Sequence, residues 1–244
     1  MDAASRNRVD EETAVAFGST ESGDNVFRPH DLLWIDDANA LKAVDSLPCW
    51  ANADWLLRAP AVVRRERVAD PRLVPVGLRG KTRNERVAVY LDRDAVAASI
   101  RPEMLVESSR CYINDHRNRL RAFEALAVLA PSLDATGLSW GPTGSVGFQL
   151  ASRLPVVRED SDLDILIRAG VPLSAPQMAE LRTIWSASIC RIDMQVDTGI
   201  GAFSFSEWAE GNGRVLLRTD MGPVLTRDPW AADNRQNAES MTRS

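Results

Sequence analysis

The stretch WGPTGSVGFQLASRLPVVREDSDLDILIRA, residues 140–169, holds the pattern that decides the fold of this chain. A turn with glycines precedes a short segment with helical spacing, and an apolar run follows that contains Asp162 and Asp164. Residues i and i+2 of a β-strand face the same side, so both carboxylates converge while Leu163 points into the core. The stretch therefore predicts a strand over residues 163–167 that presents two carboxylates on one face.

A second segment supplies a third carboxylate. In RIDMQVDTG, residues 191–199, polar and apolar residues alternate, which places Asp193 and Asp197 on one face of a strand. Carboxylates held close together repel one another, and a divalent cation removes that conflict. Mg²⁺ prefers such oxygen ligands. We therefore predict Mg²⁺ as the cofactor and Asp162, Asp164 and Asp193 as metal ligands and catalytic residues, with Asp197 as the alternative to Asp193.

The glycine turn predicts a phosphate site. Gly144 and Ser145 stand directly before VGFQLASRL, a predicted helix over residues 146–154, and the free N–H groups of a helix N-terminus bind anions. The pattern is neither a P-loop nor G-x-G-x-x-G. A glycine-serine turn, a helix, two aspartates on a strand and a later aspartate are typical of the nucleotidyltransferase superfamily. Its metals activate a hydroxyl and stabilise a departing pyrophosphate.

The rest of the chain predicts an α/β (α+β) protein with two domains. We expect a disordered tail at residues 1–25, an N-terminal domain at 26–130, a catalytic domain at 131–232 and a frayed end at 233–244. Pro131 is expected to end a helix and to mark the boundary, and Pro75 to lie on an edge or short strand. Further helices are expected at 38–44, 92–100, 114–130 and 176–189, the last with Ser174 as N-cap, and strands at 32–35, 61–63, 73–76, 87–90, 139–140, 190–196 and 215–217.

Composition limits the possible functions. The 244 residues carry a net charge of −5, so the molecule as a whole is not built for non-specific binding to nucleic acid. No run approaches 18 apolar residues, and no basic and apolar leader opens the chain, so we expect neither a membrane span nor a signal peptide. Three cysteines without a C-x-x-C pair argue against structural zinc and fit a reducing cytoplasm.

One segment departs from the acidic balance. Residues 58–93 contain ten Arg and Lys against four Asp and Glu, with VGLRGKTRNER at the centre. Guanidinium groups match phosphates bidentately, so this segment meets phosphates or an acidic protein, or else forms a solvated loop. The predicted substrate-binding residues are Gly144, Ser145, Arg158, Arg79, Lys81 and Arg83.

Taken in order, several segments resemble a specific family. FRPHDLLWID, PVGLRGKTRNER, the GS…REDSDLDILI core, RIDMQV, GAFSFSEW and a closing DPW are similar to phosphoribosyl-dephospho-CoA transferase, the MdcG family, from about Phe27 to Trp230. The resemblance implies transfer of phosphoribosyl-dephospho-CoA from 2′-(5″-triphosphoribosyl)-3′-dephospho-CoA to a serine of the acyl-carrier subunit of malonate decarboxylase. Pyrophosphate leaves in that reaction.

The resemblance also implies residue roles. The aspartate pair of the family falls on Asp162 and Asp164, and a small nucleotidyltransferase domain is expected at the C-terminal side. Arg158 would neutralise the leaving pyrophosphate. Alternatives remain open: another metal-dependent nucleotidyltransferase, with a citrate lyase-type carrier or a small-molecule acceptor, or a non-catalytic module that binds the carrier.

Overall fold

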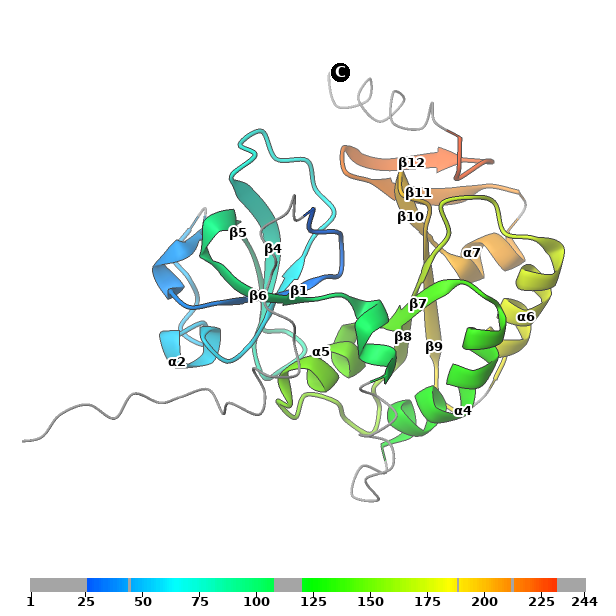
Figure 1. Cartoon of the computed structure of the whole chain (residues 1–244), viewed down its shortest axis with the longest axis horizontal. Helices are drawn as coiled ribbons and strands as arrows, with labels where there is room; N and C mark the ends of the chain where they lie inside the picture. Colours follow the sequence, from blue (N-terminus) through cyan, green and yellow to red (C-terminus); the bar gives the residue numbers. More distant parts are fainter. Residues whose placement is uncertain (1–25, 44, 108–119, 188, 212, 232–244) are drawn as a thin grey trace, which may run out of the picture.

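The computed structural model describes residues 26–43, 45–107, 120–187, 189–211 and 213–231, and it shows two six-stranded sheets with helices (Figure 1). This α+β architecture confirms the expected fold class. The predicted tails at 1–25 and 233–244 lie outside the described residues. No helix among the described residues is long and apolar enough to cross a membrane.

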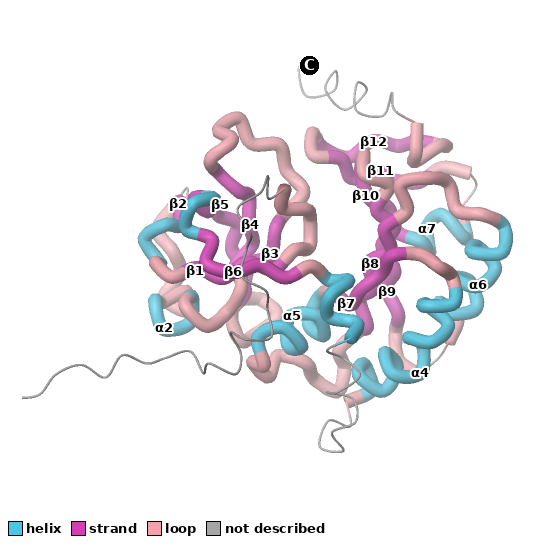
Figure 2. Tube along the Cα trace, in the orientation of Figure 1, coloured by secondary structure: helices cyan, strands magenta, loops and turns pink. Residues whose placement is uncertain are grey.

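The N-terminal sheet has the strand order β2-β5-β4-β3-β1-β6, and all its neighbours are antiparallel (Figure 2). Its core is apolar, with Leu33, Val76, Val89 and Leu91 fully buried. The elements are β1 (Leu32–Ile35), β2 (Leu41–Lys42), α2 (Ala53–Leu56), β3 (Ala61–Val63), β4 (Leu73–Arg79), β5 (Arg86–Asp92) and β6 (Val96–Ile100), with 3-10 turns η1 (Ala38–Ala40), η2 (Arg93–Ala95) and η3 (Pro102–Met104).

Two predicted helices of this domain were wrong. Asp92 ends β5 and caps the 3-10 turn η2 by accepting from Asp94 N–H, and residues 96–100 form strand β6. β6 then pairs with β1, which requires an extended backbone. Residues 38–44 likewise form η1 and the short strand β2, with residue 44 outside the described part. In both segments pairing with a neighbouring strand outweighs local helix propensity.

Pro75 was expected on an edge or a short strand, and both alternatives were wrong, because β4 is seven residues long. β4 lies between β3 and β5. The Pro75 carbonyl accepts from Arg64 N–H at 2.8 Å, directly after β3 ends at Val63. The missing N–H of proline therefore costs one ladder bond at the end of β3 rather than in its middle.

The C-terminal sheet has the order β12-β11-β10-β9-β8-β7, in which β8 and β9 are parallel and the other neighbours antiparallel. Helices α4, α6 and α7 cover the face that carries Leu163, Ile165 and Ile167. The elements are α4 (Arg121–Ala135), β7 (Ser139–Pro142), α5 (Gly144–Ser152), β8 (Leu163–Arg168), α6 (Ala175–Trp185), β9 (Ile192–Asp197), β10 (Gly201–Ser204), α7 (Phe205–Glu210), β11 (Val215–Thr219) and β12 (Gly222–Thr226).

Helix α4 corrects the expectation for Pro131. The helix continues through Pro131 to Ala135, because Leu129 and Leu133 on either side of the proline are buried in the core. That burial compensates for the lost backbone hydrogen bond. Residue 131, the expected domain boundary, thus lies inside a helix that packs on the C-terminal sheet. Residues 114–119 of the predicted helix lie outside the described residues.

Helix α6 begins as predicted, since Ser174 and Gln177 form a reciprocal capping box. It ends at Trp185, four residues before the expected end.

The two sheets meet through helix α5 and through an ion network. Phe148 and Leu154 at the α5 end of the C-terminal domain pack with Trp55 and Ala59 of the N-terminal domain. A second contact runs through Arg168 of β8, which reaches residues on both sides of the interface. The outward face of β8 and β9, with Asp164 and Arg168, is therefore turned toward the N-terminal domain.

Candidate active site

The carboxylates gather where β8 and β9 begin. Asp164 and Asp193 are directly paired in the parallel register, and Asp162 immediately precedes β8. Burial raises the pKa of Asp164 to about 6, and the negative charges of Asp193 and Asp162 add to that rise. Asp162 lies 3.5 Å from Arg191 Nη1, an exposed partner. Three negative charges thus share one edge of the site, and Asp164 is the most enclosed of them.

Asp197 lies elsewhere. It ends β9, four residues beyond Asp193, and is paired with Arg168 in the strand register. Its carboxylate accepts from Arg168 Nη1 and lies 2.9 Å from Arg65 Nη2. Its pKa is lowered because these cations outweigh the effect of burial. Of the two alternatives for the third carboxylate, Asp193 is the one that neighbours Asp164.

The N-terminus of α5 touches the same carboxylate. Gly144 has φ 58°, and a Cβ built there would lie 1.8 Å from Asp164 Oδ2. Only glycine fits both the left-handed backbone and this close approach. Thr143 N–H donates to the Asp164 carbonyl at 2.9 Å, and the Thr143 side chain makes no capping bond. The first N–H groups of α5 have no partner within the helix and are available to an anion.

A cavity of about 610 Å³ opens in front of these groups, between the two domains. Thr143, Gly144 and Asp164 line it from the C-terminal domain, and Arg79 and Arg86 line it from the N-terminal domain. Neither arginine has an ion pair with a carboxylate among the described residues. The cavity therefore brings a helix N-terminus and two uncompensated cations against a buried carboxylate, an arrangement that suits a bound polyphosphate.

Arg79 is the cation built most firmly into this wall. Its side chain lies among buried groups, where Nη1 donates to Ser145 Oγ at 3.3 Å and the guanidinium lies 4.9 Å from the centre of the Phe148 ring. Burial lowers its pKa to about 10, so the group stays charged at neutral pH. Its Nε is buried and has no hydrogen-bond partner among the described residues. The predicted residues Arg79, Gly144 and Ser145 are thus brought together.

Ser145, Asp162 and Asp193 adjoin the cavity but do not line it, and the remaining predicted binding residues do not line it either. Arg83 is exposed in the loop between β4 and β5, although its charge lowers the pKa of Asp164. Lys81 lies over the Trp55 ring, 5.8 Å from its centre. Arg158 is exposed, and its N–H donates to Ser161 Oγ. These three cations stand around the site rather than in it.

Several polar residues that line the cavity were not predicted as site residues, among them Arg86, His30, Gln195, Arg64, Arg65 and Arg218. Arg86 carried a signal, because it belongs to the basic segment and opens β5. Gln195 also carried one, since it lies on the same face of its strand as Asp193. His30 carried a weaker signal, a histidine directly after a proline, because only the turn geometry places its ring in the cavity.

Two family profiles match the chain. The profile of the phosphoribosyl-dephospho-CoA transferase MdcG N-terminal domain matches residues 28–102, and that of the MdcG C-terminal domain matches residues 112–229. Both profiles describe a transferase, and together they match most of the chain. The chain belongs to the phosphoribosyl-dephospho-CoA transferase (MdcG) family.

Curated relatives extend the match over most of the chain. A Pseudomonas putida protein named phosphoribosyl-dephospho-CoA transferase is 42% identical over 211 residues, which cover 86% of this chain and 98% of the relative. A Klebsiella pneumoniae protein of the same name is 39% identical over 203 residues, 83% of this chain and 96% of the relative. A Pseudomonas syringae protein, also of that name, is 40% identical over 205 residues, 84% and 94% respectively. No solved structure matches the chain significantly.

Proposed function

We propose that the chain transfers the phosphoribosyl-dephospho-CoA group of 2′-(5″-triphosphoribosyl)-3′-dephospho-CoA to a serine of the acyl-carrier subunit of malonate decarboxylase. The serine oxygen forms a bond to the α-phosphorus, the bond from that phosphorus to the β-phosphate bridging oxygen breaks, and pyrophosphate leaves. The serine proton passes to a base. The observation that carries this proposal is the cavity in which Arg79 and the N-terminus of α5 face Asp164.

The phosphates of the donor are assigned to the side with the positive groups. Helix α5 fixes the N–H groups of Gly144 and Ser145 before the substrate binds. The guanidinium of Arg79 is also fixed, because Ser145 and Phe148 hold it in place. Hydrogen-bond donors that are positioned before the substrate binds do not have to reorganise as negative charge moves onto the leaving pyrophosphate. Arg86 completes this side from β5.

The carboxylates fit a magnesium ion. No ion pair neutralises Asp164 or Asp193 among the described residues, and burial together with the negative charges of Asp193 and Asp162 raises the pKa of Asp164. No set of three described His, Cys, Asp or Glu side chains is gathered closely enough to hold a metal alone. Mg²⁺ is commonly bound by one or two carboxylates together with waters and substrate phosphates. Asp164 and Asp193, with Asp162 beside them, would hold it.

When bound, Mg²⁺ would supply charge to the phosphates and lower the pKa of the acceptor hydroxyl. The protein residues supply the rest. The Asp164 carboxylate packs closely against Gly144. The parallel register of β8 and β9 places Asp193 directly beside Asp164. Both domains enclose the cavity and reduce access of water to the donor.

The acyl carrier is assigned to the exposed loop between β4 and β5. Lys81 and Arg83 are exposed there, next to the cavity residues Arg79 and Arg86. Surface cations raise the rate of association with an acidic partner in a salt-dependent manner. Arg83→Ala should raise the KM for the carrier several-fold at low salt and much less at high salt. Equal effects at all salt concentrations would remove this assignment.

The transfer is tested by weighing the carrier. Wild-type protein with the triphosphoribosyl donor and the carrier subunit should add one phosphoribosyl-dephospho-CoA group, as measured by mass spectrometry. Asp164→Asn should reduce the rate by about a thousandfold, a typical effect of removing one group that stabilises the transition state. The matched control is Asp160→Asn, an exposed carboxylate in the preceding loop, which should transfer normally. Normal transfer by Asp164→Asn would refute the role of the carboxylates.

A further inference from the structure

A strained turn places a histidine in the cavity. Asp31 N–H donates to the Arg28 carbonyl at 3.0 Å, so residues 28–31 form a β-turn with Pro29 and His30 at its centre. His30 has φ 76°, a value that type II turns require at this position and that glycine normally provides. A histidine here costs backbone strain, and strained residues cluster at functional sites.

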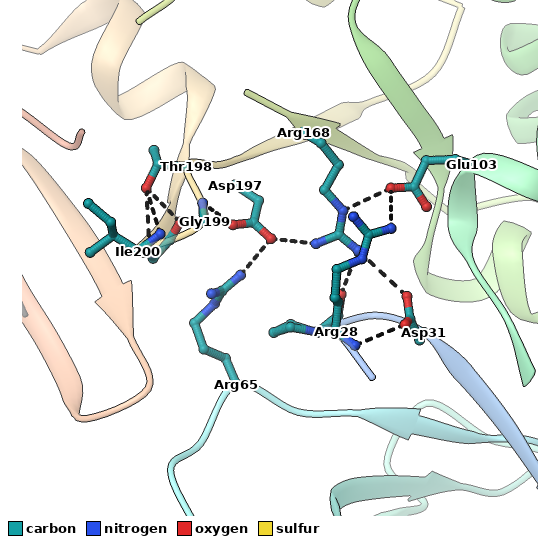
Figure 3. Close-up of polar contacts among 11 residues, drawn as sticks. Arg28, Asp31, Arg65, Glu103, Arg168, Asp197, Thr198, Gly199 and Ile200 are labelled. Carbon is teal, nitrogen blue, oxygen red and sulfur yellow. Dashed lines mark hydrogen bonds and ion pairs between the residues drawn. The ribbon is translucent and has the colours of Figure 1, made fainter. Parts of the chain in front are cut away.

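The surrounding charges hold this turn in place (Figure 3). Arg168 Nη2 donates to the Pro29 carbonyl at 3.0 Å, and Asp31 Oδ2 accepts from Arg28 N–H at 2.9 Å. His30 N–H donates to the Val63 carbonyl at 2.9 Å, which ties the turn to β3. The turn is thus fixed from both domains, and its imidazole has little freedom to leave the cavity.

The imidazole lies beside Gln195 of β9, and both side chains line the cavity. Gln195 raises the pKa of His30, but burial dominates and lowers it to about 4, so the ring is neutral at pH 7. Gln195 Oε1 is buried and has no well-aligned hydrogen-bond donor among the described residues. A neutral ring with one donor and one acceptor therefore stands next to a carboxamide whose buried oxygen has no well-aligned donor among the described residues.

This pair stands apart from the phosphate side. Gln195 is two residues, about 7 Å, along β9 from Asp193. The charged groups that act on His30 are Arg168, Arg65 and Asp197, and the two arginines share the Asp197 carboxylate. The ion pairs with Asp197 therefore partly neutralise the two arginines. Arg64 and Arg218 also line the cavity, and Arg64 is paired with Glu66 at 2.6 Å. Because Arg64 and Arg65 are both paired within the protein, the His30 and Gln195 side chains are left to bind a hydrogen-bonding part of the substrate.

We propose that His30 and Gln195 form the subsite that recognises the adenine base of the donor. The inference rests on the proposed function, because that function places a dephospho-CoA group in this cavity. A carboxamide pairs with adenine by accepting from the 6-amino group and donating to a ring nitrogen. Gln195 Oε1 accepts from the 6-amino group, and the neutral imidazole bonds the base or its ribose alongside. Adenine would thereby supply an aligned donor to a buried acceptor that has none among the described residues.

The first experiment uses the wild-type protein and needs no variant. Calorimetry compares 3′-dephospho-CoA with its analogue in which purine, without the 6-amino group, replaces adenine. The adenine form should bind about tenfold to a hundredfold more tightly, because the purine form leaves Gln195 Oε1 buried and unpaired. Equal affinities would overturn the proposal.

Two variants then locate the preference. Gln195→Met, which keeps the length of the side chain, should remove most of the preference for adenine and leave the binding of inorganic triphosphate unchanged. Arg79→Met is the matched control and should weaken triphosphate while it keeps the preference. A Gln195→Met protein that still prefers adenine would refute the subsite.

Failure of the proposed function has a different outcome. In that case the adenine preference persists, but inorganic triphosphate does not compete with the donor and the carrier gains no mass. The loss of the subsite and the loss of the transfer activity are therefore measured separately.

Discussion

Replacement of Arg168 by methionine should destabilise the contact between the two domains more than any exposed substitution. The Arg168 side chain is 11% exposed and bonds Asp197, Glu103 at 2.9 Å and the Pro29 carbonyl at 3.0 Å. In Arg168→Met, Asp197 (6% exposed) and Glu103 (17% exposed) each lose one cationic partner. Removal of one partner from a buried ion network costs about 3–5 kcal/mol, far more than the loss of one surface pair.

The assay is urea unfolding followed by tryptophan fluorescence, with the thermal midpoint as a second measure. A loss of that size lowers Tm by roughly 10 °C for a chain of this length. The matched control is Arg72→Met, because Arg72 pairs with Asp70 at 2.9 Å at the surface, where its side chain is 76% exposed. The control should change Tm little. If Arg168→Met unfolds within about 1 kcal/mol of wild type, the network does not hold the domains together.

Three further predictions follow from the site. Gly144→Ala should destabilise the fold and abolish transfer, since its Cβ would meet Asp164 Oδ2 at 1.8 Å; a fully active Gly144→Ala protein would contradict the geometry. Because the pKa of His30 is lowered to about 4, the unfolded chain takes up a proton there as pH falls from about 6.5 to 4, and the folded protein loses stability in this window. His30→Asn should therefore lose up to about 3 kcal/mol less folding stability than wild type between pH 7 and pH 4.5. Urea titrations at the two pH values measure this difference, and an unchanged pH dependence would refute the burial of a neutral ring. Arg79→Lys should raise the KM for the donor at least tenfold despite the retained charge, because lysine cannot make the bidentate contact, and kinetics that match wild type would assign Arg79 to structure alone.

The sequence predicted the centre of the C-terminal domain well for a physical reason. Alternation in residues 163–167 and 191–199 is a local signal, and the burial of Leu163 and Ile165 on one face follows directly from it. The capping box of Ser174 is equally local. Such features need no knowledge of distant residues, so they can be read from neighbours in the chain.

Long-range effects account for what was missed. Strand β6 forms because β1 offers it a partner, and α4 continues past Pro131 because Leu133 is buried on the sheet. Neither cause is visible within the segment itself. The strands β10 and β12 and helix α7 were missed for the same reason, as each is short and is stabilised by its neighbours.

The site shows the same division. The spacing of Asp162 and Asp164 and the turn at Gly144 were found from the sequence, since each is a short motif. Arg86 and His30 come from the N-terminal domain, and only the packing of the two domains brings them to the cavity. Sequence spacing therefore identifies one wall of the site and leaves the opposite wall to the structure.

The proposed transfer is tested most directly by the stoichiometry of a single reaction. Purified protein, Mg²⁺, the triphosphoribosyl donor and an acyl-carrier subunit are combined, and both the carrier mass and the released pyrophosphate are quantified. We expect one phosphoribosyl-dephospho-CoA group on one serine and one pyrophosphate for each carrier modified. A carrier that stays at its original mass, or that gains the group without release of pyrophosphate, would contradict it.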